Sequence, residues 1–390
     1  MIIGVPTELF PGERRVALVP SAIPALAKAG FEVMIQAGAG SGAGYLDPDY
    51  VAKGAKIVPN RDEIFKSADI VAQVLCYGSD DKAGVADLPR LRRGQVLAGF
   101  LRPLGSLDTL EEVAATGVSA FSVELMPRTT RAQSMDALSS MATICGYKAA
   151  LLAADTLPRL FPMMTTAAGT VTPARVLIIG AGVAGLQAIA TARRLGAVAS
   201  AYDLRPAAKE QVQSVGGRFV ELPIVAQDAQ DSRGYAKQQD EAFYQRQKEL
   251  LGNVVAESDV VITAAVVPGK KPPLLVTREM VRKMAPGSVI VDLAAERGGN
   301  CEVTLPNKTV VEHGVTVIGQ INLATAVPYH ASQMYARNIS AFLMHLFANG
   351  RKEPDLQDEI ARETLVTQAG EIVNARVREF YSLPSRVAAK

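Results

Sequence analysis

The sequence lacks tryptophan and contains only three cysteines and three histidines in 390 residues. Aromatic residues make up 5% of the chain, which argues against a base-stacking surface for nucleic acid. The cysteines, Cys76, Cys145 and Cys301, stand too far apart for a disulfide framework or a metal site. They are typical of small buried thiols in a reducing cytoplasm, and we expect no bound metal.

A strong net charge is also missing. Lysine and arginine total 41 and aspartate and glutamate total 39, so the net charge of +2 does not indicate nucleic acid or an anionic membrane as a partner. The first residues, MIIGVPTELF, lack the basic and apolar segments of a signal peptide. The most apolar long segment, residues 137–154, contains Lys148 and several hydroxyls, which favours a buried helix over a membrane span. We therefore expect a soluble chain.

Short apolar segments alternate with amphipathic ones in both halves of the chain. Expected strands cover residues 1–6, 31–38, 69–76, 95–101, 119–125, 175–180, 198–203, 217–222, 258–266, 288–294 and 315–320. Expected helices cover residues 20–30, 61–68 and 107–117 and begin again near Gly182, Pro206, Asp240 and Thr277. This alternation indicates βαβ units, and so an α/β protein with two Rossmann-like domains built on parallel sheets.

Several segments fall outside that alternation. Residues 137–157 predict a long helix joining the two domains, and residues 158–175 predict an extended excursion or a hairpin. Residues 223–239 form a polar insertion, of the kind that is often functional or mobile. We expect a first domain of residues 1–136, completed by C-terminal helices in 326–390, and a nucleotide-binding domain of residues 137–325, with the nucleotide in the cleft between them.

Gly180, Gly182 and Gly185 form a G-x-G-x-x-G motif between an expected strand and an expected helix. In that context the first glycine makes a tight turn and the second lets the backbone approach a pyrophosphate. The third lets helix and strand pack closely, and the start of the helix faces the phosphates. The motif therefore predicts a dinucleotide site.

Asp203 ends the next expected strand, about 20 residues after the motif, where an acidic residue binds the ribose hydroxyls of NAD. A carboxylate there repels a 2′-phosphate, so NAD is favoured over NADP. Arg205 leaves the choice open, because an arginine nearby can accommodate a 2′-phosphate or can simply point into solvent.

The sequence offers few candidates for an acid–base residue. Oxidising an alcohol or an amine with NAD releases a proton, which a positioned base usually accepts. His313 is expected in a turn and His345 on an apolar helix, and only His330 is expected in a loop. Transfer of hydride between two nicotinamides needs no such base, because it only requires the two rings to be held in contact.

A second polar cluster stands at the start of the long expected helix. It contains Arg128, Arg131, Gln133, Asp136 and Ser139, and the last two lie one helical turn apart. The residues are compatible with a site at a domain junction. They are equally compatible with ordinary helix-start chemistry in which Ser134 is the N-cap.

Three segments carry a family resemblance. They are MPRTTRAQSMDALSSMATICGYKA, AAGTVTPARVLIIGAGVAGLQAIATARRLGA and the opening GVPTELFPGERRVALVP. Together they resemble the soluble NAD(H)-binding component of proton-translocating nicotinamide nucleotide transhydrogenase, the first domain of its alpha subunit. The resemblance extends over nearly the whole chain.

The resemblance implies roles for particular residues. Arg128, Gln133 and Asp136 would orient the nicotinamide, assisted by Ser139, with no acid–base residue. The remaining implied NAD(H)-binding residues are Gly180, Gly182, Val183 and Gly185 at the pyrophosphate, Asp203, Leu204 and Arg205 at the adenosine ribose, Gly234 and Tyr235 on a mobile loop, and Gln247 and Val266.

The resemblance also implies partners. The component would be a homodimer in which FPMMTTAAGTV forms an intersubunit hairpin. It would pass hydride from NADH to NADP⁺ on a partner subunit, without metal, flavin or covalent intermediate. A membrane-embedded proton-channel subunit would couple this transfer to proton translocation, and would hold the chain at the cytoplasmic face of the inner membrane.

Two alternatives remain at this point. Alanine dehydrogenase shares the ERRVAL opening with Arg15, but that family uses a lysine and a histidine near the places where Gln73 and Arg102 stand here. Its expected aspartate near VDLAAERGG is also replaced, by Glu296. A non-catalytic NAD-sensing module would bind the nucleotide and exchange hydride with no partner.

Overall fold

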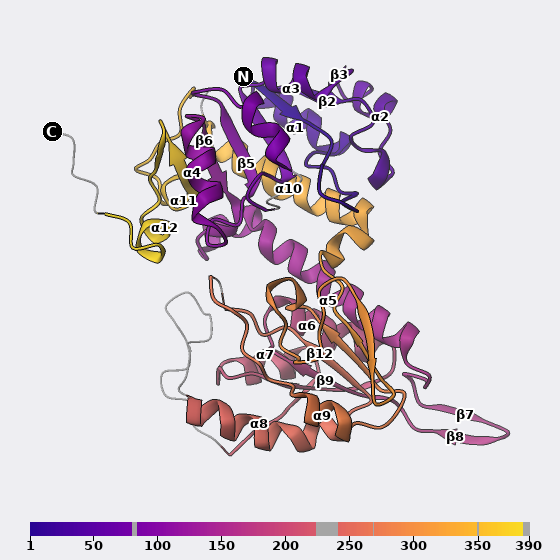
Figure 1. The fold of residues 1–390 in the computed structure, drawn as a ribbon. Coiled ribbons are helices and arrows are strands. Elements are labelled where there is room, and N and C mark those ends of the chain that lie inside the picture. Colours follow the sequence, from indigo (N-terminus) through magenta and orange to yellow (C-terminus); the bar gives the residue numbers. More distant parts are fainter. Residues whose placement is uncertain (80–83, 224–240, 268, 349–350, 385–390) are drawn as a thin grey trace. The chain divides into compact units, whose positions relative to one another are not determined.

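The computed structural model describes residues 1–79, 84–223, 241–267, 269–348 and 351–384. By its internal contacts the chain divides into two compact units (Figure 1). Unit 1 comprises residues 1–141 and 325–390, and unit 2 comprises residues 142–324. Each unit is an α/β structure around one mostly parallel sheet, so the predicted fold class is confirmed.

Unit 1 contains an eight-stranded sheet with the strand order β17-β16-β6-β5-β4-β1-β2-β3. Its strands are β1 (Ile2–Val5), β2 (Glu32–Gln36), β3 (Lys56–Val58), β4 (Ile70–Leu75), β5 (Val96–Phe100), β6 (Ser119–Ser122), β16 (Leu365–Gln368) and β17 (Glu371–Ile372). Its helices are α1 (Ile23–Lys28), α2 (Asp47–Val51), α3 (Arg61–Ser67), α4 (Leu107–Ala115), α10 (Pro328–Leu346), α11 (Glu359–Thr364) and α12 (Ala375–Phe380).

The C-terminal tail is not wholly helical, and the expectation of helices alone in residues 326–390 is wrong. Strands β16 and β17 form an antiparallel hairpin, and β16 extends the sheet by pairing antiparallel to β6. The hairpin turns at Ala369 and Gly370, whose φ angles of 54° and 100° suit a tight two-residue turn. The β-branched residues before that turn favour a strand, and they override the helical spacing of the flanking residues.

Unit 2 contains a seven-stranded sheet with the strand order β11-β10-β9-β12-β13-β15-β14, in which only β14 is antiparallel. Its strands are β9 (Arg175–Ile179), β10 (Val198–Tyr202), β11 (Arg218–Phe219), β12 (Val260–Thr263), β13 (Val289–Asp292), β14 (Thr309–Glu312) and β15 (Val315–Ile318). Its helices are α6 (Val183–Arg194), α7 (Ala208–Ser214), α8 (Glu241–Ala256) and α9 (Arg278–Lys283), together with most of α5 (Ala137–Thr156), which begins in unit 1.

The sheet of unit 2 is buried on both faces. Along β9, Val176 and Ile178 join one apolar cluster, and Leu177 and Ile179 join the other. This is why the central strands read as continuous apolar runs rather than as alternating ones. The carboxyl end of β9 is therefore held firmly between helices, which positions the glycine turn that follows it.

Helix α5 is the long helix that the sequence predicted. By length and composition alone it could cross a membrane, and 39% of its most apolar 18-residue window is buried, so the expectation of a buried helix is met only in part. Its Ala149, Ala150 and Ala153 lie in an apolar core of unit 2.

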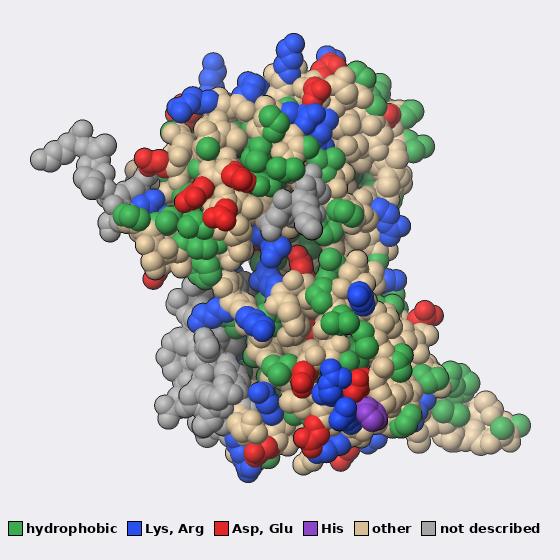
Figure 2. All heavy atoms as spheres, in the orientation of Figure 1, with side chains coloured by type: hydrophobic (Ala, Val, Ile, Leu, Met, Phe, Trp, Pro, Cys, Tyr) green, Lys and Arg blue, Asp and Glu red, His purple; other side chains and the backbone are tan. Residues whose placement is uncertain are grey.

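Residues after α5 form the predicted hairpin, with strands β7 (Met164–Thr166) and β8 (Gly169–Val171) paired antiparallel. Its residues are exposed, and Met163, Met164 and Val171 present apolar side chains on the projecting hairpin seen in Figure 2. An exposed apolar hairpin of this kind is typical of a contact surface.

Candidate functional site

The glycine turn of unit 2 has the geometry that the motif predicted. Gly180 follows β9 with φ of 101°, and a Cβ there would lie 2.9 Å from backbone atoms of Ala264 and Ala265. A Cβ on Gly185 would lie 1.9 Å from the carbonyl oxygen of Gly180. Both positions therefore require glycine, one for its backbone conformation and the other for the contact between α6 and the turn.

Gly182 differs from these two glycines because its surroundings are open. It is the N-cap residue of α6, and no atom lies within 4 Å of the position of an added Cβ. Val183, the first helical residue, is 39% exposed. The unpaired N–H groups at the start of this twelve-residue helix thus face accessible space, which suits an anionic group such as a pyrophosphate.

Gly146 on α5 completes this packing, and the sequence reasoning missed it. A Cβ on Gly146 would lie 2.0 Å from the carbonyl oxygen of Ala184. Helix α5 therefore touches the first turn of α6 through backbone alone. A glycine within an apolar helix is a signal of close packing, but the sequence does not show which segment it meets.

Asp203 and Arg205 form a buried ion pair beside the glycine turn. The guanidinium binds the carboxylate with both Nε and Nη2 at 2.9 Å, and the two side chains are 16% and 7% exposed for arginine and aspartate. The Asp203 carboxylate also accepts the N–H of Ala181 at 2.7 Å. Arg205 therefore does not point into solvent, and the hydrogen bond to Asp203 raises its pKa.

The other predicted residues of unit 2 lie in different surroundings. Leu204 follows Asp203 and is half-buried, as is Val266 after β12. Gln247 on α8 is buried and donates to the Tyr202 hydroxyl at 2.8 Å, so it supports the end of β10. Gly234 and Tyr235, predicted on a mobile loop, lie outside the described residues.

The polar cluster of unit 1 surrounds the start of α5. Gln133 is exposed on a short 3-10 helix, Thr130–Met135, and Arg128 is exposed just before it. The Asp136 carboxylate accepts the N–H of Ser139 at 2.9 Å and its hydroxyl at 2.5 Å. Asp136 is therefore the side chain that caps α5, and the reading of Ser134 as N-cap is wrong.

Two further residues of this segment have structural partners. The carbonyl oxygen of Ser134 accepts a hydrogen bond from Asn338 on α10 at 2.8 Å. Arg131 forms an ion pair with Asp358 at 2.6 Å and belongs with the C-terminal segment rather than with Asp136. The sequence placed Arg131 in the cluster by proximity along the chain, which does not determine the direction of a side chain.

The three histidines are placed mostly as expected. His313 and Gly314, with φ of 50° and 77°, make the turn between β14 and β15. His345 on α10 lies 2.9 Å from the Asp358 carboxylate. His330 is exposed in the first turn of α10, so its expected place in a loop is wrong. Among the described residues, no group of three His, Cys, Asp or Glu side chains could hold a metal ion.

Unit 1 also contains buried charged groups that bind one another. Arg15 binds Glu13 with Nε at 2.8 Å and Nη2 at 2.6 Å, and the two side chains are 3% and 0% exposed. Gln73 is buried, and its carbonyl oxygen accepts the Tyr335 hydroxyl at 2.7 Å. These internal partners occupy the side chains that would otherwise face a small carboxylate substrate.

Glu8 is the buried acid with the clearest consequence for stability. Burial, followed by the neighbouring Glu13, raises its pKa to about 8, although the N–H groups of Leu75 and Val74 oppose this shift. As the pH rises from 4.5 to 8, the unfolded chain loses this proton while the folded chain keeps it, so folding becomes less favourable.

We expect the unfolding temperature of the unchanged chain to fall by roughly 5 °C between pH 5 and pH 8 and then to level off. Differential scanning calorimetry of Glu8→Gln should show a smaller fall. The exposed Glu32→Gln variant should keep the original profile. A Glu8→Gln variant with an undiminished fall would assign the pH dependence to other groups.

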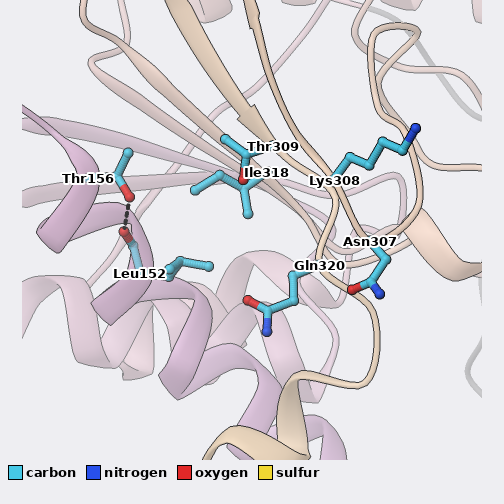
Figure 3. A pocket seen from close by; sticks show the side chains of 7 residues that line it. All are labelled: Leu152, Thr156, Asn307, Lys308, Thr309, Ile318 and Gln320. Carbon is cyan, nitrogen blue, oxygen red and sulfur yellow. Dashed lines mark hydrogen bonds between the residues drawn. The ribbon is translucent and has the colours of Figure 1, made fainter. Parts of the chain in front are cut away.

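A surface hollow of about 230 Å³ lies elsewhere in unit 2 (Figure 3). It lies between α5 and the ends of β14 and β15 and is lined by Leu152, Thr156, Asn307, Lys308, Thr309, Ile318 and Gln320. None of the predicted site residues lines it. The glycine turn and Asp203, rather than this hollow, carry the case for nucleotide binding.

Comparison with known proteins gives a consistent result. Two family models match, namely alanine dehydrogenase/PNT, N-terminal domain, over residues 4–145 and alanine dehydrogenase/PNT, C-terminal domain, over residues 149–375. The first part of the NAD(P) transhydrogenase alpha subunit of Rhodospirillum rubrum, a separate chain, is 44% identical over 96% of this chain and 98% of its own length. Alanine dehydrogenase of Mycolicibacterium smegmatis is 29% identical over 100% and 99%. The solved structure of transhydrogenase from Sinorhizobium meliloti is 40% identical with a TM-score of 0.84, covering 96% of this chain and all of that one.

Proposed function

Because the chain belongs to the alanine dehydrogenase/PNT family, we propose that it is the NAD(H)-binding component of a proton-translocating transhydrogenase. It passes hydride from NADH directly to NADP⁺ on a partner subunit, and a membrane-embedded proton-channel subunit couples this transfer to proton translocation. The observation that carries the proposal is the similarity to the first part of a transhydrogenase alpha subunit over 96% of this chain at 44% identity, against 29% for an alanine dehydrogenase.

The residues of unit 2 fit an NAD(H) site. Gly182 leaves open space at the start of α6, where the helix N–H groups would bind the pyrophosphate. The Asp203 carboxylate would accept the adenosine-ribose hydroxyls. Bound NADH supplies the hydride, and the chain supplies position and an electrostatic environment.

The start of α5 is proposed to orient the nicotinamide. Arg128 and Gln133 are exposed beside Asp136, which Ser139 holds in one orientation. Helix α5 carries both Ser139 and Gly146, and seven residues of helix span about 10 Å. A nucleotide lying along this helix from the pyrophosphate turn would extend toward Ser139. Gly234 and Tyr235 are proposed to close over it.

Quaternary structure and location are part of the same proposal. The exposed apolar side chains of the β7–β8 hairpin fit a homodimer contact. Proposed partners are an NADP(H)-binding subunit and the membrane subunit, which would hold this chain at the cytoplasmic face of the inner membrane.

Alanine dehydrogenase is the second candidate, because an enzyme of that name aligns with this whole chain. Its chemistry needs a residue that binds the substrate carboxylate and a base. Here Arg15 is buried against Glu13, and Gln73 replaces the lysine that the resemblance implied. Arg102 stands near the place of the histidine. A guanidinium is protonated throughout the ordinary pH range, so it does not serve as a base.

The deciding experiment mixes the chain with an NADP(H)-binding transhydrogenase subunit and follows nucleotide oxidation and reduction in a stopped-flow spectrophotometer. Rapid hydride transfer is expected in the mixture, with none from either protein alone. The same chain is assayed alone for NADH oxidation with pyruvate and ammonia. Activity there, together with no transfer in the mixture, would identify an alanine dehydrogenase. Nucleotide binding without either activity would identify an NAD-sensing module.

A further inference from the structure

One carboxylate of unit 2, that of Asp203, has all of its acceptor positions occupied. Its Oδ1 accepts the backbone N–H of Arg205 at 2.8 Å and Nε at 2.9 Å. Its Oδ2 accepts the N–H of Ala181 at 2.7 Å and Arg205 Nη2 at 2.9 Å. An ionised carboxylate offers about four lone-pair positions. A ribose diol therefore has to displace a donor that is already present.

The four donors differ in how easily they can leave. The N–H groups of Ala181 and Arg205 belong to the glycine turn and to the segment directly after β10, so the backbone holds them in place. The guanidinium is on a flexible side chain and is 16% exposed. It also donates to the carbonyl oxygen of Ala181 at 3.2 Å, so it joins the end of β10 to the turn after β9. Arg205 is thus the replaceable donor.

We propose that Arg205 is an internal competitor of the nucleotide, which occupies Asp203 in the nucleotide-free chain and withdraws its guanidinium when the ribose hydroxyls bind. This inference rests on the proposed function, because it takes Asp203 as the ribose acceptor. It makes Arg205 a determinant of affinity rather than a direct ligand of NADH. A component that exchanges its nucleotide in every turnover benefits from such a competitor, because weaker binding allows faster release.

The same pair discriminates between NAD and NADP. While the guanidinium binds Asp203, it is not available for a 2′-phosphate. A 2′-phosphate that drew the guanidinium away would then face the exposed charge of the carboxylate. The arginine that left the cofactor choice open in the sequence is therefore part of the discrimination against NADP(H).

The test is an NADH titration, followed by nucleotide fluorescence, of the unchanged chain and of Arg205→Gln. Removal of the competing charged donors is expected to tighten NADH binding about tenfold. The dissociation rate should fall by a similar factor. Arg205→Lys keeps the charge with a single compact donor group, so it should give a smaller gain, and it serves as a second variant if Arg205→Gln folds poorly.

Two further variants make the test specific. In the Asp203→Asn background, which is expected to weaken NADH binding by itself, Arg205→Gln should produce no gain. Arg175→Gln is the matched control, because Arg175 lies at the opposite end of β9 with only an exposed Glu257 at 4.0 Å. It should bind NADH as the unchanged chain does.

The outcomes separate this inference from the proposed function. If the unchanged chain binds NADH but Arg205→Gln binds it equally or less tightly, Arg205 is not a competitor and the NAD(H) site stands. A gain that persists in the Asp203→Asn background also overturns the inference. If the unchanged chain binds no NADH, both the inference and the proposed function are overturned.

Discussion

Replacing Gly185 with alanine is expected to abolish measurable NADH binding and to destabilise unit 2. The new methyl carbon would lie 1.9 Å from the carbonyl oxygen of Gly180, where both atoms belong to backbone that cannot rotate away. Helix α6 would have to move away from β9, and its buried Ala188, Ile189 and Ala192 would lose their fit in the core. Overpacking of this kind costs about 1–3 kcal/mol or more of the free energy of unfolding.

Two other glycines provide matched controls for this result. Gly182→Ala adds a methyl group where no atom lies within 4 Å, so the unfolding temperature should stay unchanged. NADH binding should still weaken, because the methyl group occupies space near the proposed pyrophosphate. Gly252→Ala, inside α8 and only 3.7 Å from flexible Met280 atoms, should leave binding unchanged and should not destabilise the chain.

The three variants separate folding from binding in one series. Each protein is measured by NADH titration and by thermal unfolding. If Gly185→Ala bound NADH normally with an unchanged unfolding temperature, the close contact between α6 and the turn would be contradicted. If Gly182→Ala bound NADH as tightly as the unchanged chain, the pyrophosphate site would lie elsewhere.

Much of the fold could be predicted because its signals are local. Apolar runs marked the central strands, and the glycine motif marked the turn between β9 and α6. The errors arose where two local signals competed. In residues 358–380 helical spacing concealed a short hairpin at Ala369–Gly370, and β14 was too short and too exposed to be noticed beside β15.

Contacts between distant residues could not be predicted in the same way. The sequence placed Arg205 two residues after Asp203, but either a solvent-facing arginine or a paired one was compatible with that spacing. The contact of Gly146 with Ala184 joins two helices, and no pattern within either helix identifies the other. Arg131 and Asp358 pair across 227 positions, which is why proximity along the chain misassigned Arg131. The roles of Arg128, Gln133 and Asp136 stay predictions.

Asp136 allows the capping role to be separated from the proposed role in hydride transfer. Asp136→Ala removes the acceptor for the N–H and the hydroxyl of Ser139. Loss of an N-cap costs about 1 kcal/mol of folding stability. If Asp136 also orients the nicotinamide, the transfer rate in the mixture with the NADP(H)-binding subunit should fall about 100-fold, because small displacements of reacting groups have effects of that size.

Two comparisons decide between these roles. Asp136→Ser keeps an oxygen that can cap α5, so it should restore the unfolding temperature without restoring the transfer rate. Asn60→Ala removes the corresponding cap of α3, where the side chain accepts the N–H of Glu63 at 2.9 Å. It should cost similar stability and leave the rate unchanged. A transfer rate that followed the unfolding temperature across all three variants would make Asp136 a helix cap and nothing more, and the nicotinamide would then have to be oriented by residues other than Asp136.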